Sequence, residues 1–192
     1  MTKRWLDEIL EKNELYAQWP DFLRQPTTIL PGQRVLVTCM DPRINLQAVG
    51  ARPKKEGEEI ERIVLTRGGV PDMASLFVLL YLANMKEFAF MTHTDCGLTK
   101  VQKDPGRAIA RMRERLGEEG FKRAKALIGE PLEQKILSWL GAFADPRDEV
   151  KQRVENFKNH PLVPPDVIAH GLLLDLATGK VEIVVNGYET QG

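Results

Sequence analysis

The sequence has little cysteine, no excess of either charge and no long apolar run. Cys39 and Cys96 are the only cysteines among its 192 residues, too few for the disulfide framework of a small secreted domain. The formal net charge of zero gives no electrostatic reason to expect nucleic acid as a partner. No apolar run reaches the about 20 residues of a membrane helix, and no signal-peptide pattern opens the chain. We therefore expect a cytoplasmic protein that binds neither nucleic acid nor a membrane.

Hydrophobic residues, in contrast, make up 43% of the chain, which is enough for a full core. The length suits one domain, and we expect a single domain over residues 1–192. Its first part, residues 1–33, is predicted to hold an amphipathic helix over residues 5–19 and a proline-containing connector. Residues 34–185 are predicted to form the α/β core.

Short apolar runs alternate with helical patterns along this core. The apolar runs predict strands, over residues 34–39, 63–66, 87–92, 167–174 and 181–185. The helical patterns predict helices, over residues 45–49, 73–82, 107–140 and 145–159, with breaks near 117–120 and at Pro131. The alternation is typical of an α/β fold with a mainly parallel four-stranded sheet and helices on both faces. The turn at 178–179 predicts that the last strand is an added antiparallel edge. We expect a charged loop over residues 50–59 and a loose tail after Asn186.

The predicted helix over residues 73–82 is apolar on nearly every face, and Asp72 is its expected N-cap. A helix of this kind is buried on more than one side. Two interpretations are open: a helix inside the core of one chain, and a helix shared with a second subunit.

Three side chains with metal-binding chemistry follow two of the predicted strands. Cys39 ends the strand over residues 34–39, and His93 and Cys96 come after the strand over 87–92. Two thiolates and an imidazole suit zinc in a tetrahedral site, and a fourth position left open is typical of catalytic zinc. If the two strands are neighbours in a parallel sheet, their carboxyl ends meet at one edge. Buried cysteines are often only small hydrophobes, but the three residues together favour a metal.

Other polar residues lie near these candidate ligands. Arg43 is two residues from Asp41, and a bidentate pair would keep the carboxylate ionised. The carboxylate would then be an acceptor aimed at the nucleophile on zinc, or else part of an ion pair that stabilises the loop. His160 and His170 are candidate proton relays, although a structural role suits each of them better.

The motifs Cys-Met-Asp-Pro-Arg at 39–43 and His-Thr-Asp-Cys-Gly at 93–97 together resemble the β-class carbonic anhydrases. The closing pattern over residues 161–179 is similar to the short archaeal and fungal branch of that family. The resemblance covers residues 34–185. It implies a four-stranded parallel sheet with an added antiparallel strand, in an obligate homodimer or a dimer of dimers. In such a dimer the N-terminal helix reaches over the partner.

The same resemblance implies that Cys39, His93 and Cys96 hold Zn²⁺, with Asp41 and Arg43 as the catalytic dyad. The implied activity is that of a carbonate dehydratase, in which zinc-bound hydroxide hydrates carbon dioxide to bicarbonate. An alternative is the hydrolysis of carbonyl sulfide or carbon disulfide on the same zinc site. A second alternative is a non-catalytic zinc-binding homologue.

One loop departs from the family pattern. Where typical members have Arg-Asn-Ala-Gly or Lys-Asn-Ala-Gly, this chain has Thr66, Arg67, Gly68 and Gly69. The two glycines can adopt positive φ and let backbone approach a ligand, and we expect the loop to line the substrate pocket. If the Arg67 head faces that pocket, it narrows the space. If it turns outward to a carboxylate, the pocket is wider and more apolar, which suits carbonyl sulfide.

Overall fold

The structure is a computed structural model that describes residues 5–18, 34–49 and 62–189. The chain divides into two compact units, residues 1–30 and 31–192. In the first unit, helix α1 (Trp5–Ala17) confirms the predicted N-terminal helix, although it ends before position 19. The predicted connector and the predicted charged loop over 50–59 lie outside the described residues. Whether the chain is one domain stays a prediction.

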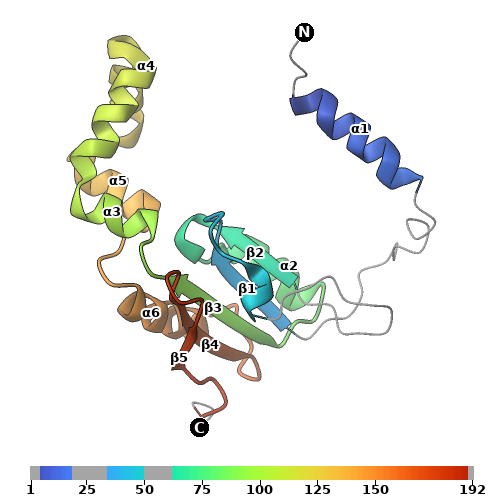
Figure 1. The fold of residues 1–192 in the computed structure, drawn as a ribbon. Helices are drawn as coiled ribbons and strands as arrows, with labels where there is room; N and C mark the ends of the chain where they lie inside the picture. The colour runs from blue at the N-terminus through green and yellow to red at the C-terminus, as the bar shows by residue number, and fades with distance from the viewer. Residues whose placement is uncertain (1–4, 19–33, 50–61, 190–192) are drawn as a thin grey trace. The chain divides into compact units, whose positions relative to one another are not determined.

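The second unit is built on a five-stranded sheet in the order β2-β1-β3-β4-β5 (Figure 1). The strands are β1 (Arg34–Cys39), β2 (Arg62–Thr66), β3 (Glu87–His93), β4 (Ile168–Leu174) and β5 (Val181–Val185). The first four are parallel, and β5 is antiparallel to β4. The chain reverses before β5 where Gly179, at φ 70°, donates its amide to the Asp175 carbonyl oxygen at 2.8 Å. The predicted α/β fold is confirmed.

The main core lies on one face of this sheet. Val35 and Val37 of β1 point to the same side as Phe88 and Phe90 of β3, because side chains alternate along a strand. Helices α2 (Met73–Tyr81) and α6 (Pro146–Lys158) pack there. A smaller cluster, around Leu36, Met91 and Leu174, lies apart from it. The described cover of this cluster includes residues of the 3₁₀ helix η2 (Leu46–Val49).

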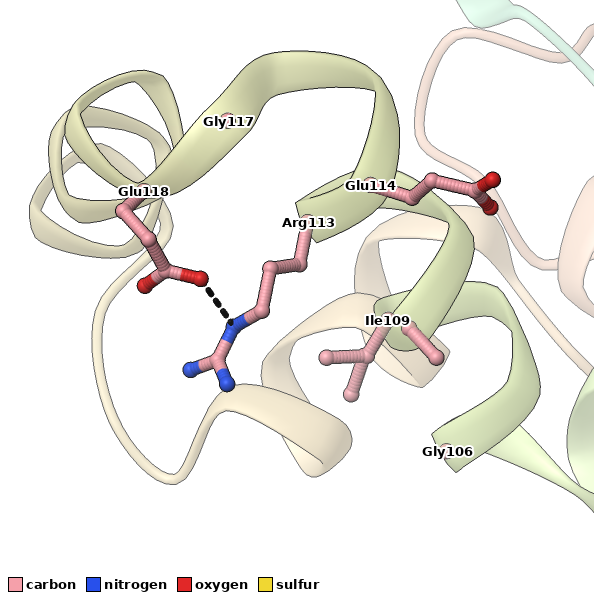
Figure 2. Close-up of a pocket in the computed structure, with 7 residues that line it drawn as sticks. Gly106, Ile109, Arg113, Glu114, Gly117 and Glu118 are labelled. Carbon is pink, nitrogen blue, oxygen red and sulfur yellow. Dashed lines mark ion pairs between the residues drawn. The ribbon is translucent and has the colours of Figure 1, made fainter.

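Helices α3 (Gly97–Lys103), α4 (Pro105–Ile128) and α5 (Leu132–Leu140) connect β3 to α6. They confirm the predicted helical region and its break at Pro131, while α3 was not predicted. Helix α4 is interrupted at Gly117, at φ 65°, as the sequence predicts. Figure 2 shows Arg113 paired with Glu118 across this interruption, 3.6 Å apart. None of the described helices combines the length and the apolar character that crossing a bilayer requires.

Helix α2 has the predicted N-cap, but its burial is one-sided among the described residues. Asp72 is its N-cap, as predicted, and accepts a hydrogen bond from the Ser75 amide at 3.0 Å. However, only Leu76 and Leu80 are buried in α2, while Phe77 is 42% exposed and Tyr81 49% exposed. Among the described residues, cover is therefore found only on the side of α2 that holds Leu76 and Leu80, and the choice between the two interpretations stays open.

The predicted loose tail is wrong for its described part, residues 187–189. The Gly187 amide donates to Nδ1 of His170 at 3.1 Å, and the Tyr188 hydroxyl donates to the Glu87 carboxylate. The ring of Tyr188 also packs edge-on against that of His170. These contacts hold the segment against the amino-terminal ends of β3 and β4.

Candidate metal centre

The three predicted ligands converge at the carboxyl-terminal edge of the sheet. Strands β1 and β3 are parallel neighbours, so Cys39 at the end of one lies beside His93 at the end of the other. Cys96 follows three residues later, as the residue that precedes α3. The candidate ligand atoms of these residues lie within 4.8 Å of one another, and all three residues are buried. A buried group of this composition has the donor set of a zinc site.

The histidine ring is already oriented for a ligand. Nδ1 of His93 lies 2.8 Å from the carbonyl oxygen of Thr94, and a carbonyl only accepts, so Nδ1 carries the hydrogen. Nε2 then presents a lone pair. It is buried and has no hydrogen-bond partner within the described part of the chain. A buried polar atom without a partner is costly, and a metal ion would satisfy it, with Thr94 fixing the tautomer.

The two cysteines are free thiols. The pKa of the Cys39 thiol is held well below its usual range, chiefly because the Cys96 thiol donates a hydrogen bond to its thiolate. The same interaction, together with burial, raises the pKa of Cys96. The pair therefore carries one negative charge readily, and a cation between the sulfur atoms is what would favour the second thiolate.

Asp41 and Arg43 form the bidentate pair that their spacing predicts. Nε and Nη2 of Arg43 donate to Oδ1 and Oδ2 of Asp41 at 2.9 and 2.7 Å. The Arg43 amide donates to Oδ1 as well, at 3.0 Å. These hydrogen bonds hold the pKa of Asp41 well below its usual range. The Asp41 carboxylate is therefore ionised and fixed in orientation beside the three candidate ligands.

Sequence reasoning missed Asp95 as a partner of Arg43. Nη1 of Arg43 donates to Oδ2 of Asp95 at 2.7 Å, and Nη2 donates to its carbonyl oxygen at 3.0 Å. Lys100, at 2.8 Å, and Arg43 together lower the pKa of Asp95 to about 2. The position of Asp95 between His93 and Cys96 was the available signal, but the pairing with Arg43 needs the adjacency of β1 and β3.

The loop over residues 67–69 lies beside Cys39, because Thr66 is the register partner of Cys39. Gly68 and Gly69 have φ values of 59° and 72°, and these positive values confirm the prediction made from the two glycines. Nε and Nη2 of Arg67 donate to the carbonyl oxygens of Leu140 and Trp139, at 2.9 and 3.2 Å. The guanidinium thus binds the carboxyl-terminal end of α5, with helix carbonyls in place of the predicted carboxylate. That the loop lines a substrate pocket stays a prediction.

The two remaining histidines have local partners. Nδ1 of His160 accepts a hydrogen bond from the Leu162 amide at 3.2 Å. His170 lies 3.2 Å from Glu87, at the start of β3, and thus at the opposite end of that strand from His93. These contacts favour the structural interpretation of both residues.

A scan against protein-family models finds no match. The protein named "Putative carbonic anhydrase YvdA" of Bacillus subtilis (strain 168) is 30% identical, over 97% of this chain and 94% of that protein. A "Carbon disulfide hydrolase" of Acidianus sp. (strain A1-3) is 26% identical, over 94% and 89% of the two chains. The crystal structure of β-carbonic anhydrase isoform I from Trichomonas vaginalis has a TM-score of 0.73 and 25% identity, covering 97% of this chain and 100% of that one.

The chain therefore belongs to the β-class carbonic anhydrase family, which confirms the resemblance of its two motifs. The relatives include proteins named for two kinds of reaction, on carbon dioxide and on carbon disulfide.

Proposed function

We propose that this protein is a zinc enzyme that hydrates carbon dioxide to bicarbonate, with Cys39, His93 and Cys96 as the zinc ligands. The observation that carries the proposal is the buried Nε2 of His93, which lies beside two thiols and has no hydrogen-bond partner among the described residues. A zinc ion held by these residues would lower the pKa of a bound water from 15.7 to about 7 and would supply a nucleophile at neutral pH. Family membership supports the reaction.

In this proposal Asp41 and Arg43 orient the attacking water. The ionised carboxylate of Asp41 can only accept hydrogen bonds, so a water hydrogen points at it and a lone pair is left for the substrate carbon. Arg43 keeps the carboxylate in place through Nε and Nη2. Asp95 in turn holds Nη1 of Arg43. The chain thereby fixes the nucleophile's direction before the substrate enters.

The second candidate is the hydrolysis of carbonyl sulfide or carbon disulfide at the same site. Two observations favour it: the relatives named carbon disulfide hydrolase, and the engagement of Arg67 by α5 carbonyls. With its guanidinium bound to the end of α5, Arg67 would not narrow the space beside the candidate ligands.

We further propose that the protein is a cytoplasmic homodimer. Two free, buried cysteines suit a reducing compartment. The exposed apolar side of α2, with Phe77 and Tyr81, supports the interpretation that a second subunit shares this helix.

Stopped-flow measurements on zinc-loaded protein test the activity, with parallel assays of carbonyl sulfide and carbon disulfide hydrolysis. We expect kcat/KM to be largest for carbon dioxide and to be lost in Cys96→Ser. A larger kcat/KM for either sulfur compound would establish the second candidate instead. A folded, zinc-loaded protein that is inactive on all three compounds would establish a non-catalytic homologue.

The same assays test whether Arg67 contributes to substrate choice. We expect Arg67→Asn to raise carbon dioxide hydration relative to carbonyl sulfide hydrolysis. The quantity compared is the ratio of kcat/KM for carbon dioxide to kcat/KM for carbonyl sulfide. If this ratio in Arg67→Asn stays within about twofold of the wild-type ratio, which is under ~0.4 kcal/mol of differential transition-state binding, Arg67 does not set the substrate.

A further inference from the structure

Arg153 of α6 is a buried cation that the proposed reaction does not use. Only 4% of the residue is exposed. Its Nη1 donates to the carbonyl oxygen of Gly68 at 2.6 Å, and its Nε donates to Oε1 of Glu149 at 3.0 Å. The guanidinium carbon lies 5.2 Å from the centre of the Phe143 ring, and Phe143 packs in one cluster with Cys39 and Cys96.

The guanidinium lies against the strand ends that carry the candidate ligands. A Cβ placed on Gly69 would lie 3.2 Å from Nη1 of Arg153, 3.3 Å from the carbonyl carbon of Thr38 and 3.0 Å from the carbonyl oxygen of Met91. Thr38 directly precedes Cys39, and Met91 is two residues before His93. Gly69 is therefore held between Arg153 and the carboxyl-terminal ends of β1 and β3.

The burial of the Arg153 guanidinium lowers the stability of the fold. A buried guanidinium loses its hydration, and Nη2 of Arg153 has no hydrogen-bond partner among residues 5–18, 34–49 and 62–189. Burial lowers the pKa of Arg153, and the adjacent Glu149 carboxylate opposes that shift. An apolar side chain would fill the same core position without these costs, so the cation has another use.

We propose that Arg153 is a positioning residue, which fixes the turn over residues 67–70 against the metal centre through the Gly68 carbonyl oxygen. Two consecutive glycines at positive φ give this turn little rigidity of its own. Other hydrogen bonds of the turn are those of Arg67 to α5, of the Val70 amide to the Arg67 carbonyl oxygen, and of the Thr66 hydroxyl to the Val70 carbonyl oxygen at 2.8 Å. Among these donors, Arg153 is the one that lies on α6. The effect on catalysis rests on the proposed function, but the effect on the turn does not.

Hydrogen exchange at the Val70 amide reports how readily the turn opens, because this amide donates to the Arg67 carbonyl oxygen at 3.0 Å. The variants are Arg153→Met, which removes charge and donors, and Arg153→Lys, which keeps the charge and one donor group. Val154→Ala is the matched control: it is the next residue of α6, 5% exposed, and packs in the core rather than on the turn. Exchange is normalised to that of the β3 amides, which report the stability of the whole sheet.

We expect Val70 to exchange at least tenfold faster in Arg153→Met, less than threefold faster in Val154→Ala, and at an intermediate rate in Arg153→Lys. With carbon dioxide, we expect kcat to fall at least tenfold in Arg153→Met at full zinc occupancy and to recover in part in Arg153→Lys. Equal effects in Arg153→Met and Val154→Ala would overturn the proposal and leave Arg153 only a stability role. If Arg153→Met does not fold, unchanged Val70 exchange in Arg153→Lys has the same consequence. Wild-type protein without hydration activity would contradict the proposed function, while the exchange data would still decide the role of Arg153.

Discussion

At the scale of single residues, the centre depends on hydrogen bonds that leave particular atoms available. Thr94 occupies Nδ1 of His93 and leaves Nε2 unpartnered in the described part of the chain. Arg43 occupies both carboxylate oxygens of Asp41 and keeps the group ionised. Each residue type was evident from its motif, because cysteine, histidine and a carboxylate beside an arginine carry recognisable chemistry. The tautomer and the orientation come from contacts that only the fold supplies.

Asp41→Asn should retain zinc and lose turnover. The amide still accepts a hydrogen bond, but it loses the charge that pairs with Arg43, and removing one preorganised electrostatic partner typically costs about 10²–10³ in rate. Because the pKa of Asp41 is held well below its usual range, the carboxylate is ionised throughout pH 6–9, and the loss should be uniform across that interval. Stopped-flow hydration rates measure it.

Asp148→Asn is the control for that substitution, because Asp148 is an exposed carboxylate of α6 that is 3.5 Å from Lys151. It should leave the rate unchanged. Equal turnover of Asp41→Asn and wild type from pH 6 to 9 would mean that Asp41 only stabilises its loop.

At the scale of elements, the strands were predictable and the pairings between loops were not. The apolar runs predicted all five strands. Burial on both faces requires such runs in the central strands β1 and β3, whereas the outer strands β2 and β5 keep exposed apolar residues. Asp95 and Arg153 escaped prediction because their partners Arg43 and Gly68 lie 52 and 85 residues away in sequence. Such pairs form only once β1 and β3 are neighbours and α6 packs beneath them. The glycine loop was predicted to adopt positive φ, but its ties to α5 and α6 were not.

Gly68→Ala should lower the free energy of unfolding by more than the strain of a positive φ alone accounts for. A Cβ at Gly68 would collide with Cδ1 of Leu98 and lie 3.3 Å from the Phe143 ring. Gly179 has a similar φ of 70° and open space around it, so Gly179→Ala isolates the backbone cost of about 1–2 kcal/mol. Gly68→Ala should lose about 1–3 kcal/mol more through overpacking. Urea unfolding measures both. Equal losses of unfolding free energy in the two variants would show that Leu98 and Phe143 move aside for the added methyl group without a measurable loss of stability.

At the scale of the whole molecule, one side of α2 is largely uncovered by the described residues. Four large apolar side chains on that side and at the C-cap are 42–65% exposed, namely Phe77, Val78, Tyr81 and Leu82. The apolar pattern of this helix predicted burial but could not show whether the cover comes from the same chain or from another. The described structure covers only the side with Leu76 and Leu80.

We expect the dimer to be the smallest stable unit, because exposed apolar patches of this kind mark interaction sites. Sedimentation at micromolar concentration should give a dimer or a multiple of it, and Val78→Glu should shift it to monomer. Leu116→Glu is the control, since Leu116 is 48% exposed on α4 and outside this patch. A well-folded wild-type monomer at micromolar concentration would refute the expectation.

The central claim is that Cys39, His93 and Cys96 hold one zinc ion per chain, and zinc-edge X-ray absorption of the purified protein tests it most directly. The account predicts near-stoichiometric zinc with two sulfur ligands at about 2.3 Å and nitrogen or oxygen ligands at about 2.0–2.1 Å. The Cys96→Ser variant should lose most of the metal. A zinc shell without sulfur, or full zinc retention in both Cys39→Ser and Cys96→Ser, would contradict the claim.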